Sequence, residues 1–418
     1  MRWLSIIGSW LFSRRIERDL ARVWRLVRDN PEFVVLALGV LLRCTTYGEN
    51  RTFWMDEASL WGNIKGKPIL DFSEPLAGDQ LAPLGFLIAQ RALVRVLGTS
   101  RYVARLIPLV SGIVALGLLA RLARRTLPRR GALVALILFA ISDDLVYYSS
   151  EMKPYSLDLA VGLALSLAAL GALEMPLSFR RAAAMGIAAL VAPWCSFASA
   201  FVVAGSGATL ILFSLLCRRY RDAAVWVAIS TGWGASFTLA YQASQAVLTP
   251  YTSMYKFWWF AFLPIWPPSL DHLSRAAGIL LEIFVNPLNV VGPTWPWVGV
   301  ALPLSLVLAG GISLARRSWP AWAILVLPIA LAMLASGMKR YPFHGRLILE
   351  LVPAFFLLIA AGTERLRDLA TGRARIGYVT VLVLVLAYPC LASFYQTAWD
   401  PPRDFNRHGD LHKNLFIQ

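Results

Sequence analysis

Long apolar runs dominate the chain, and short clusters of arginine separate them. About 20 consecutive apolar residues are enough to cross the hydrocarbon core of a bilayer as a helix. A membrane β-strand is shorter, about 10 residues, and alternates apolar with polar positions. The pattern therefore predicts an all-α polytopic membrane protein. The predicted spans are residues 32–47, 102–121, 131–148, 156–174, 182–199, 200–217, 222–243, 297–315, 319–337, 347–363 and 376–393, about 11 in number.

For three segments, hydropathy alone does not decide how they cross the membrane or whether they cross it. Residues 182–217 form one apolar stretch, which we divide at "APWCSF" because Pro193 and Trp194 favour a tight turn. Residues 81–98 and 275–292 are apolar but contain charged and amide side chains. We expect both to form helices that lie along the outer membrane interface or dip into it.

The arginine clusters orient the chain. Short loops rich in Lys and Arg face the cytoplasm in most membrane proteins. With the N-terminus inside, every compact cluster between spans falls on the cytoplasmic side, which predicts an N-in, C-out arrangement. The clusters lie at 121–130, 180–181, 218–221, 316–317 and 365–375.

The predicted organisation has three parts. Residues 1–31 form a basic amphipathic helix on the anionic cytoplasmic surface. Residues 32–393 form the transmembrane domain, and residues 394–418 form a tail that faces outward. The outer loops of the transmembrane domain are 48–101, 149–155, 244–296 and 338–346.

Composition agrees with this class of protein. The chain has 418 residues, of which 58% are hydrophobic and 15% charged, and its mean hydropathy is +0.60. A soluble domain needs far less apolar surface. The net charge of +16 would suit nucleic acid in a soluble protein, but here the arginines report topology, so we predict no nucleic-acid partner. The cysteines lack metal-binding spacing and are predicted to pack in or beside apolar segments: Cys44, Cys195, Cys217 and Cys390.

Charged side chains on the outer face form the candidate site. Asp56 and Glu57 lie in "FWMDEASLW", just after the first span, and the third outer loop is aromatic at 251–268. Cations outside oppose the topology rule, whereas an anionic ligand explains them, because Lys and Arg bind phosphate oxygens. Carboxylates supply acid–base or metal chemistry. Together they predict an enzyme that acts on a lipid-phosphate substrate. The other outer candidates are Glu151, Lys153, Tyr155, Trp258, Trp259, Lys339, Arg340, Tyr341, His344 and Arg346.

Structural interpretations stand beside this one. Acidic residues favour helix N-termini, so Asp56 and Glu57 could cap a juxtamembrane helix. Lys339 and Arg340 could extend to the polar interface like many long cations. The lysine of the second outer loop could simply pair with Glu151, and the tryptophans of the third could belong to the aromatic belt.

Four segments, in chain order, resemble landmarks of the GT-C glycosyltransferases. "WMDEASLW" resembles the acidic motif of their first outer loop, and "LAPLGFLIAQRALVRVLGTSRYVARLIPLVSG" resembles the next landmark, although Ala82-Pro83-Leu84 stands where the family often has His-Pro-Pro-Leu. "YSSEMKPYSLDLAV" and "YPFHGRLILELVPAFFLLIAAG" resemble the second-loop and late landmarks. The nearest branch holds the protein O-mannosyltransferases and the lipid A aminoarabinose transferases. The resemblance covers residues 32–175 and 338–365.

The resemblance implies a helical bundle with juxtamembrane helices and a cavity at the non-cytoplasmic surface. It implies an inverting transfer of a sugar from a polyprenyl-phosphate-linked donor to an acceptor hydroxyl. The acceptor would be a glycan, a glycolipid or a protein, and membrane lipids would be further partners. The expected location is the periplasmic side of a bacterial inner membrane.

The resemblance also implies roles for single residues. Asp56 would be the general base and Glu57 would support it. A divalent metal ion is the one cofactor left open, because some relatives use one; Asp56 and Glu151 would be its ligands. The candidates for the donor phosphate are Lys153, Arg346, Arg340, Lys339 and His344. The candidates for the sugar or the lipid are Tyr155, Tyr341, Trp258 and Trp259.

Other classes stay open at this point. A lipid-linked glycan polymerase or ligase would also use outer cations, but we expect no Asp-Glu pair after its first span. A flippase or transporter more often has repeated halves and charges in mid-helix. Asp158 lies near the start of the 156–174 span, and the chain has no sequence repeat. A scaffold would not explain acids and cations in separate outer loops.

Overall fold

The computed structural model describes residues 29–244, 253–264, 269–292, 296–372 and 374–395. The predicted basic helix at 1–31 and the predicted tail lie almost wholly outside these residues. Within them, the structure is helical, and an isolated bridge pairs Leu76 with Gln80. The helices are α2 (Pro31–Gly48), α3 (Met55–Gly66), η1 (Ile69–Ser73), α4 (Leu84–Leu97), α5 (Arg101–Ala104), α6 (Leu106–Thr126), α7 (Arg129–Ile141), α8 (Asp143–Tyr148), α9 (Tyr155–Glu174), α10 (Phe179–Cys195), α11 (Ser199–Leu216), α12 (Tyr220–Ala243), α13 (Ser253–Phe257), η2 (Trp259–Ala261), α14 (Leu270–Glu282), α15 (Pro296–Arg317), α16 (Trp319–Gly337), η3 (Gly345–Leu351), α17 (Val352–Leu369) and α18 (Ala374–Phe394).

The apolar runs form the long helices that the sequence predicts. In the described ranges, 9 helices are long and apolar enough to cross a membrane: α2, α6, α9, α11, α12, α15, α16, η3 with α17, and α18. The chain is therefore a multi-pass membrane protein. The other two predicted spans form the shorter helices α7, of 13 residues, and α10, of 17 residues.

Two predicted boundaries are wrong. The predicted span 131–148 is not one helix, because the backbone leaves helical geometry at Ser142 and α8 begins at Asp143. The predicted helix at 275–292 begins earlier and ends at Glu282, before irregular chain around Asn286 and Pro287. Polar and proline residues at these places interrupt the helical ladder. The division at "APWCSF" is confirmed, since α10 ends at Cys195 and α11 begins at Ser199.

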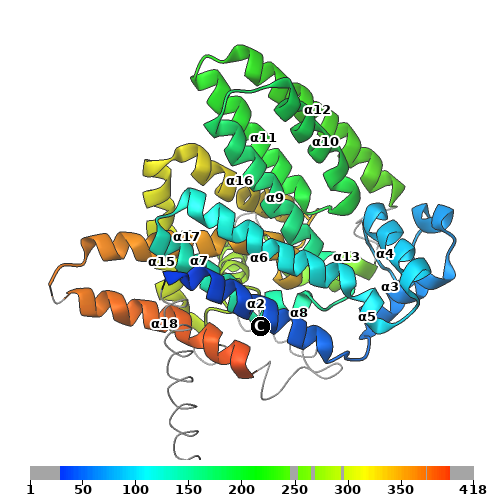
Figure 1. The fold of residues 1–418 in the computed structure, drawn as a ribbon, viewed down its shortest axis with the longest axis horizontal. Helices are drawn as coiled ribbons and strands as arrows, with labels where there is room; N and C mark the ends of the chain where they lie inside the picture. Colours follow the sequence, from blue (N-terminus) through cyan, green and yellow to red (C-terminus); the bar gives the residue numbers. More distant parts are fainter. Residues whose placement is uncertain (1–28, 245–252, 265–268, 293–295, 373, 396–418) are drawn as a thin grey trace, which may run out of the picture.

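The helices form a bundle with two projecting parts. Helices α10, α11 and α12 pack against one another and extend from one end of the molecule, in green in Figure 1. Helices α3, α4 and α5, in blue, lie at another edge of the bundle. This blue group encloses a small apolar cluster of its own, which includes Leu60, Ile64, Phe72 and Phe86.

A close backbone contact joins α15 and α17. A Cβ atom added at Gly310 would lie 1.9 Å from the carbonyl oxygen of Leu358. A Cβ atom at Gly362 would lie 2.2 Å from the carbonyl oxygen of Leu306. Small residues allow such close crossings in membrane helices. Helix α17 is also buried along most of its length. It therefore holds the preceding helix η3 in a fixed position.

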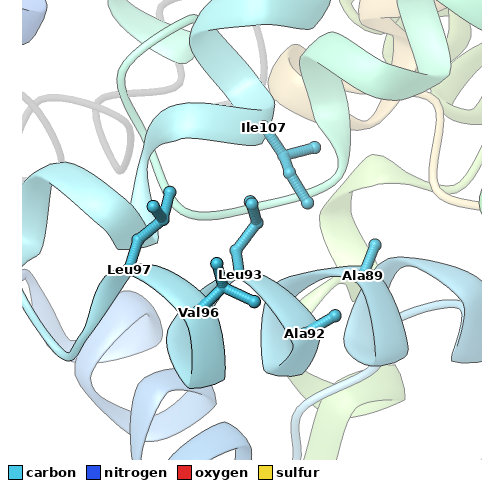
Figure 2. Close-up of a pocket in the computed structure, with 6 residues that line it drawn as sticks. All are labelled: Ala89, Ala92, Leu93, Val96, Leu97 and Ile107. Carbon is cyan, nitrogen blue, oxygen red and sulfur yellow. The ribbon is translucent and has the colours of Figure 1, made fainter.

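Helix α4 confirms the predicted helix within residues 81–98 and has two apolar faces. One face packs into the cluster around Phe86, and a Cβ atom at Gly85 would lie 2.5 Å from the carbonyl oxygen of Trp194 at the end of α10. The second face borders a groove of about 500 Å³ beside the start of α6 (Figure 2). The groove is lined by Ala89, Ala92, Leu93, Val96, Leu97 and Ile107. An outer helix with a second apolar face of this kind suits the predicted interfacial position.

We predict that Gly362→Ala destabilises the bundle. The new methyl group would meet the backbone of α15, which cannot move aside like a flexible side chain, so a loss of at least the ~1–3 kcal/mol typical of overpacking is expected. Unfolding of the detergent-solubilised protein by heat or SDS measures it. Gly377→Ala on α18 is the matched control, since a Cβ atom there has no neighbour within 4 Å. Equal stability of the two variants would contradict the described crossing.

Candidate active site

Asp56 lies in the first turn of α3, and both of its carboxylate oxygens face donors of the protein. Its Oδ2 accepts a hydrogen bond from Nη2 of Arg346 at 2.6 Å, across 290 residues of sequence. Its Oδ1 faces Nε2 of Gln80 at 3.5 Å, at the outer limit of a hydrogen bond. The side chain of Asp56 is 21% exposed, so it remains accessible from outside.

Arg346 is buried beneath this carboxylate, on η3. The rings of Trp54, Tyr155 and Trp258 have their centroids 5.2–5.8 Å from its Cζ atom, a cation–π arrangement. Its Nε and Nη1 atoms are buried and make no hydrogen bond to any residue that the structure describes. An unsatisfied buried donor is costly. The guanidinium therefore has the capacity to bind a further acceptor.

Lys153 adds a second cation from the loop between α8 and α9. Its Nζ donates a hydrogen bond to Oε1 of Gln80. Burial lowers the pKa of the Lys153 ammonium to about 8; the Asp56 carboxylate opposes the shift, and the Arg346 cation adds to it. The site therefore holds one strong cation and one whose charge depends on pH near neutrality.

Glu57, next to Asp56, has a different environment. It is fully buried, and its carboxylate takes two hydrogen bonds from Arg105, of 2.9 Å at Nε and 2.7 Å at Nη2. It also accepts from the backbone N–H of Met152 at 2.8 Å and from that of Trp54 at 3.4 Å. The predicted helix-capping contact is thus present. Glu57 ties α3 to the start of α6 and to the second outer loop.

The remaining predicted site residues differ in whether they are buried near Arg346 or exposed. Trp258 is buried beside Arg346, and His344 packs against Phe260, with 5.2 Å between ring centroids. Tyr341 packs on Phe201 and donates its hydroxyl hydrogen to the carbonyl oxygen of Leu347. The exposed candidates are Trp259, Lys339 and Arg340.

Glu151, the second predicted metal ligand, is buried near Lys153 and Arg346. Its carboxylate favours the charged form of both cations. Among the described residues, no group of three or more His, Cys, Asp or Glu side chains is placed to hold a metal ion. Asp56, the other predicted ligand, already faces Arg346. A metal site at Asp56 and Glu151 stays a prediction.

Comparison with solved structures identifies the fold. The structure matches the archaeal oligosaccharyltransferase AglB from Archaeoglobus fulgidus, in complex with an inhibitory peptide and a dolichol-phosphate, with a TM-score of 0.54 and 13% identity over 89% of this chain and 56% of that chain. It matches ArnT from Cupriavidus metallidurans, bound to undecaprenyl phosphate, with a TM-score of 0.51 and 13% identity over 87% of this chain and 75% of that chain. This chain has the GT-C fold.

The GT-C likeness is structural. No protein-family model and no curated protein matches the sequence. The chain spans about half the length of the oligosaccharyltransferase chains that it matches, 56% and 53% for two of them. At such low identity the match establishes the fold alone, and the resemblance seen in the sequence motifs is confirmed at that level.

Three residues of this candidate site lie outside the predicted set: Trp54, Gln80 and Arg105. Trp54 lies in "WMDEASLW" and Arg105 lies in the second quoted segment, so both belong to segments that carry the resemblance. Gln80 follows Gly78 and Asp79, which signal a turn. Its contacts with Lys153 and Asp56 depend on tertiary structure, and no local pattern indicates them.

We predict that the two adjacent acids contribute differently to the stability of the fold. Glu57→Gln leaves Arg105 buried without a full countercharge, and removing one member of a buried pair costs about 3–5 kcal/mol. Asp56→Asn also removes the countercharge of a buried arginine, but Asp56 is 21% exposed and Arg346 keeps its three ring contacts, so this change should cost less. Thermal unfolding of both detergent-solubilised variants measures the difference. If Glu57→Gln were as stable as Asp56→Asn, Glu57 would not be the structural tie described here.

Proposed function

We propose that the chain is an inverting glycosyltransferase, which moves a sugar from a polyprenyl-phosphate-linked donor to an acceptor hydroxyl. The reaction would take place on the periplasmic face of a bacterial inner membrane. One observation carries the proposal: an accessible carboxylate, Asp56, directly contacts a buried guanidinium, that of Arg346, which has two unused donors. A base beside an anion-binding group is what transfer from a phosphate leaving group requires.

Asp56 is suited to the role of general base. A base must lie within hydrogen-bond reach of the proton that it removes. Within the described part of the chain, the hydrogen bond to Oδ1 is the long contact from Gln80, which an acceptor hydroxyl can replace. The acceptor oxygen then forms a bond to the anomeric carbon while the bond from that carbon to the phosphate oxygen breaks. Asp56 takes the hydroxyl proton, and the lipid phosphate leaves with the electron pair.

Arg346 and Lys153 are suited to binding the departing phosphate. The free Nε and Nη1 of Arg346 and the ammonium of Lys153 offer charge-assisted hydrogen bonds. Surrounding rings keep water away from Arg346, which strengthens electrostatic stabilisation of developing charge. The lipid phosphates bound by the two structural neighbours, a dolichol-phosphate and undecaprenyl phosphate, support this substrate class.

The remaining candidates take secondary places in the proposal. Trp258 and Tyr155 already border Arg346, so they would contact the sugar or the first lipid units. His344 lies behind Trp258, with 6.3 Å between the ring centroids, and would support it. Tyr341 has its hydroxyl engaged with the backbone. Lys339, Arg340 and Trp259 are exposed and would meet substrate only at the edge of the site.

We predict that Asp56→Asn abolishes transfer while the protein still folds. Loss of a general base lowers rates by about 10²–10⁴-fold. The test is deletion of the gene, followed by mass spectrometry of envelope glycans after complementation with wild type or with Asp56→Asn. A sugar that is lost on deletion and restored by wild type alone would identify donor sugar and acceptor together. Equal restoration by Asp56→Asn would overturn the proposed role of Asp56.

We predict that binding of undecaprenyl phosphate weakens at alkaline pH. Lys153 loses its proton as the pH rises through about 8, so its attraction for phosphate is present below that value and lost above it. The affinity should fall by up to about tenfold per pH unit beyond the pKa. Lys153→Arg is the control, because arginine stays charged over this range. If both proteins show the same pH dependence, Lys153 does not bind the phosphate.

A further inference from the structure

Gln80 ends a tight turn that returns the chain to α3. Gly78 and Asp79 both have positive φ angles, 75° and 53°. This left-handed region is open to glycine and tolerated by aspartate. The bridge between Leu76 and Gln80 closes the turn. The bridge thereby fixes the backbone of Gln80 within this turn.

Asn63 of α3 clamps this turn. Its Nδ2 donates to the carbonyl oxygen of Ala77 at 3.0 Å, and its Oδ1 accepts from the N–H of Ala77 at 2.9 Å. Gly78 lies against Ser59 of the same helix, where an added Cβ atom would come within 3.0 Å of Oγ. The turn and Asp56 therefore belong to one rigid unit, and the placement of Gln80 beside Asp56 is built into α3.

The side chain of Gln80 lies between two opposite charges. Its Oε1 accepts a hydrogen bond from Lys153, and its Nε2 donates to the carbonyl oxygen of Gly78 at 2.9 Å and faces Oδ1 of Asp56 at 3.5 Å. A neutral amide is both donor and acceptor, so it can serve a cation and a carboxylate together. Without it, a buried ammonium and a nearby carboxylate attract each other strongly.

We propose that Gln80 is a positioning residue that keeps Lys153 from pairing directly with Asp56. The ammonium then faces the donor phosphate, and the carboxylate remains open to the acceptor hydroxyl. A direct pair would engage both groups at once and weaken phosphate binding. This inference rests on the proposed function, because it assigns Lys153 to a phosphate and Asp56 to a hydroxyl.

The test is a double-mutant cycle on the full chain in lipid nanodiscs, with undecaprenyl phosphate as the probe. Gln80→Leu, of similar size, should lower its affinity about 10- to 100-fold, the weight of one charged hydrogen bond. Asp56→Asn should change the affinity far less. In the double variant the affinity should return toward that of Asp56→Asn, because the Asp56 carboxylate is no longer present to capture Lys153. Gln80→Ala repeats the test without the bulk of leucine.

The outcomes separate the two proposals. A merely structural Gln80 would make the losses additive, so a double variant as weak as Gln80→Leu would overturn the inference. Wild-type affinity in both Gln80 variants would also overturn it, provided that Arg346→Ala weakens binding. If the wild type did not bind undecaprenyl phosphate at all, the proposed function would fail and the inference with it. Gln242→Leu, at an exposed glutamine of α12, is the control and should bind like wild type.

Discussion

The buried ion pair between Glu57 and Arg105 is the constraint on which the outer part of the site depends. With the N–H of Met152, it joins α3, the start of α6 and the second outer loop at one carboxylate. A buried pair adds little net stability compared with apolar packing, but it fixes geometry because neither charge tolerates loss of the other. Asp56 and Lys153, each one residue from a member of this junction, are placed by it.

The inner part of the site has a different support. Arg346 lies on η3, which leads directly into α17, and α17 contacts α15 through backbone at Gly310 and Gly362. The candidate site therefore lies where two bodies meet: an outer unit organised by α3 and a bundle organised by α17. The contact of Asp56 with Arg346 joins the outer unit to the bundle at the candidate site.

The sequence predicted the parts of this arrangement that depend on local composition. Apolar runs located the spans, and the conflict between outer cations and the topology rule selected Lys153 and Arg346. The break at Ser142 was missed because the span was assigned from average hydropathy, although Ser142 is followed by Asp143 and Asp144, a run typical of a helix N-terminus. The contacts of Gln80 were missed for another reason: they join residues from separate loops, and no periodicity encodes them. The GT-C motifs located Asp56. The difference in burial between Asp56 and Glu57 depends on tertiary contacts, which the sequence does not show.

The contacts between outer loops also impose a parity on the membrane topology. Residues that touch must lie on the same side, so an even number of crossings must separate them. Between α3 and Met152, which binds Glu57, lie the α-helices α4, α5, α6, α7 and α8. With α4 at the interface, as predicted, and α5 and α8 of only 4 and 6 residues, α6 and α7 either both cross or neither does. Between Lys153 and Arg346 lie five long helices, α9, α11, α12, α15 and α16, together with α10. With α6 as a span, parity requires that α7 crosses. With the five long helices as spans and α14 at the interface, as predicted, parity requires that α10 crosses as well, although α7 and α10 are short.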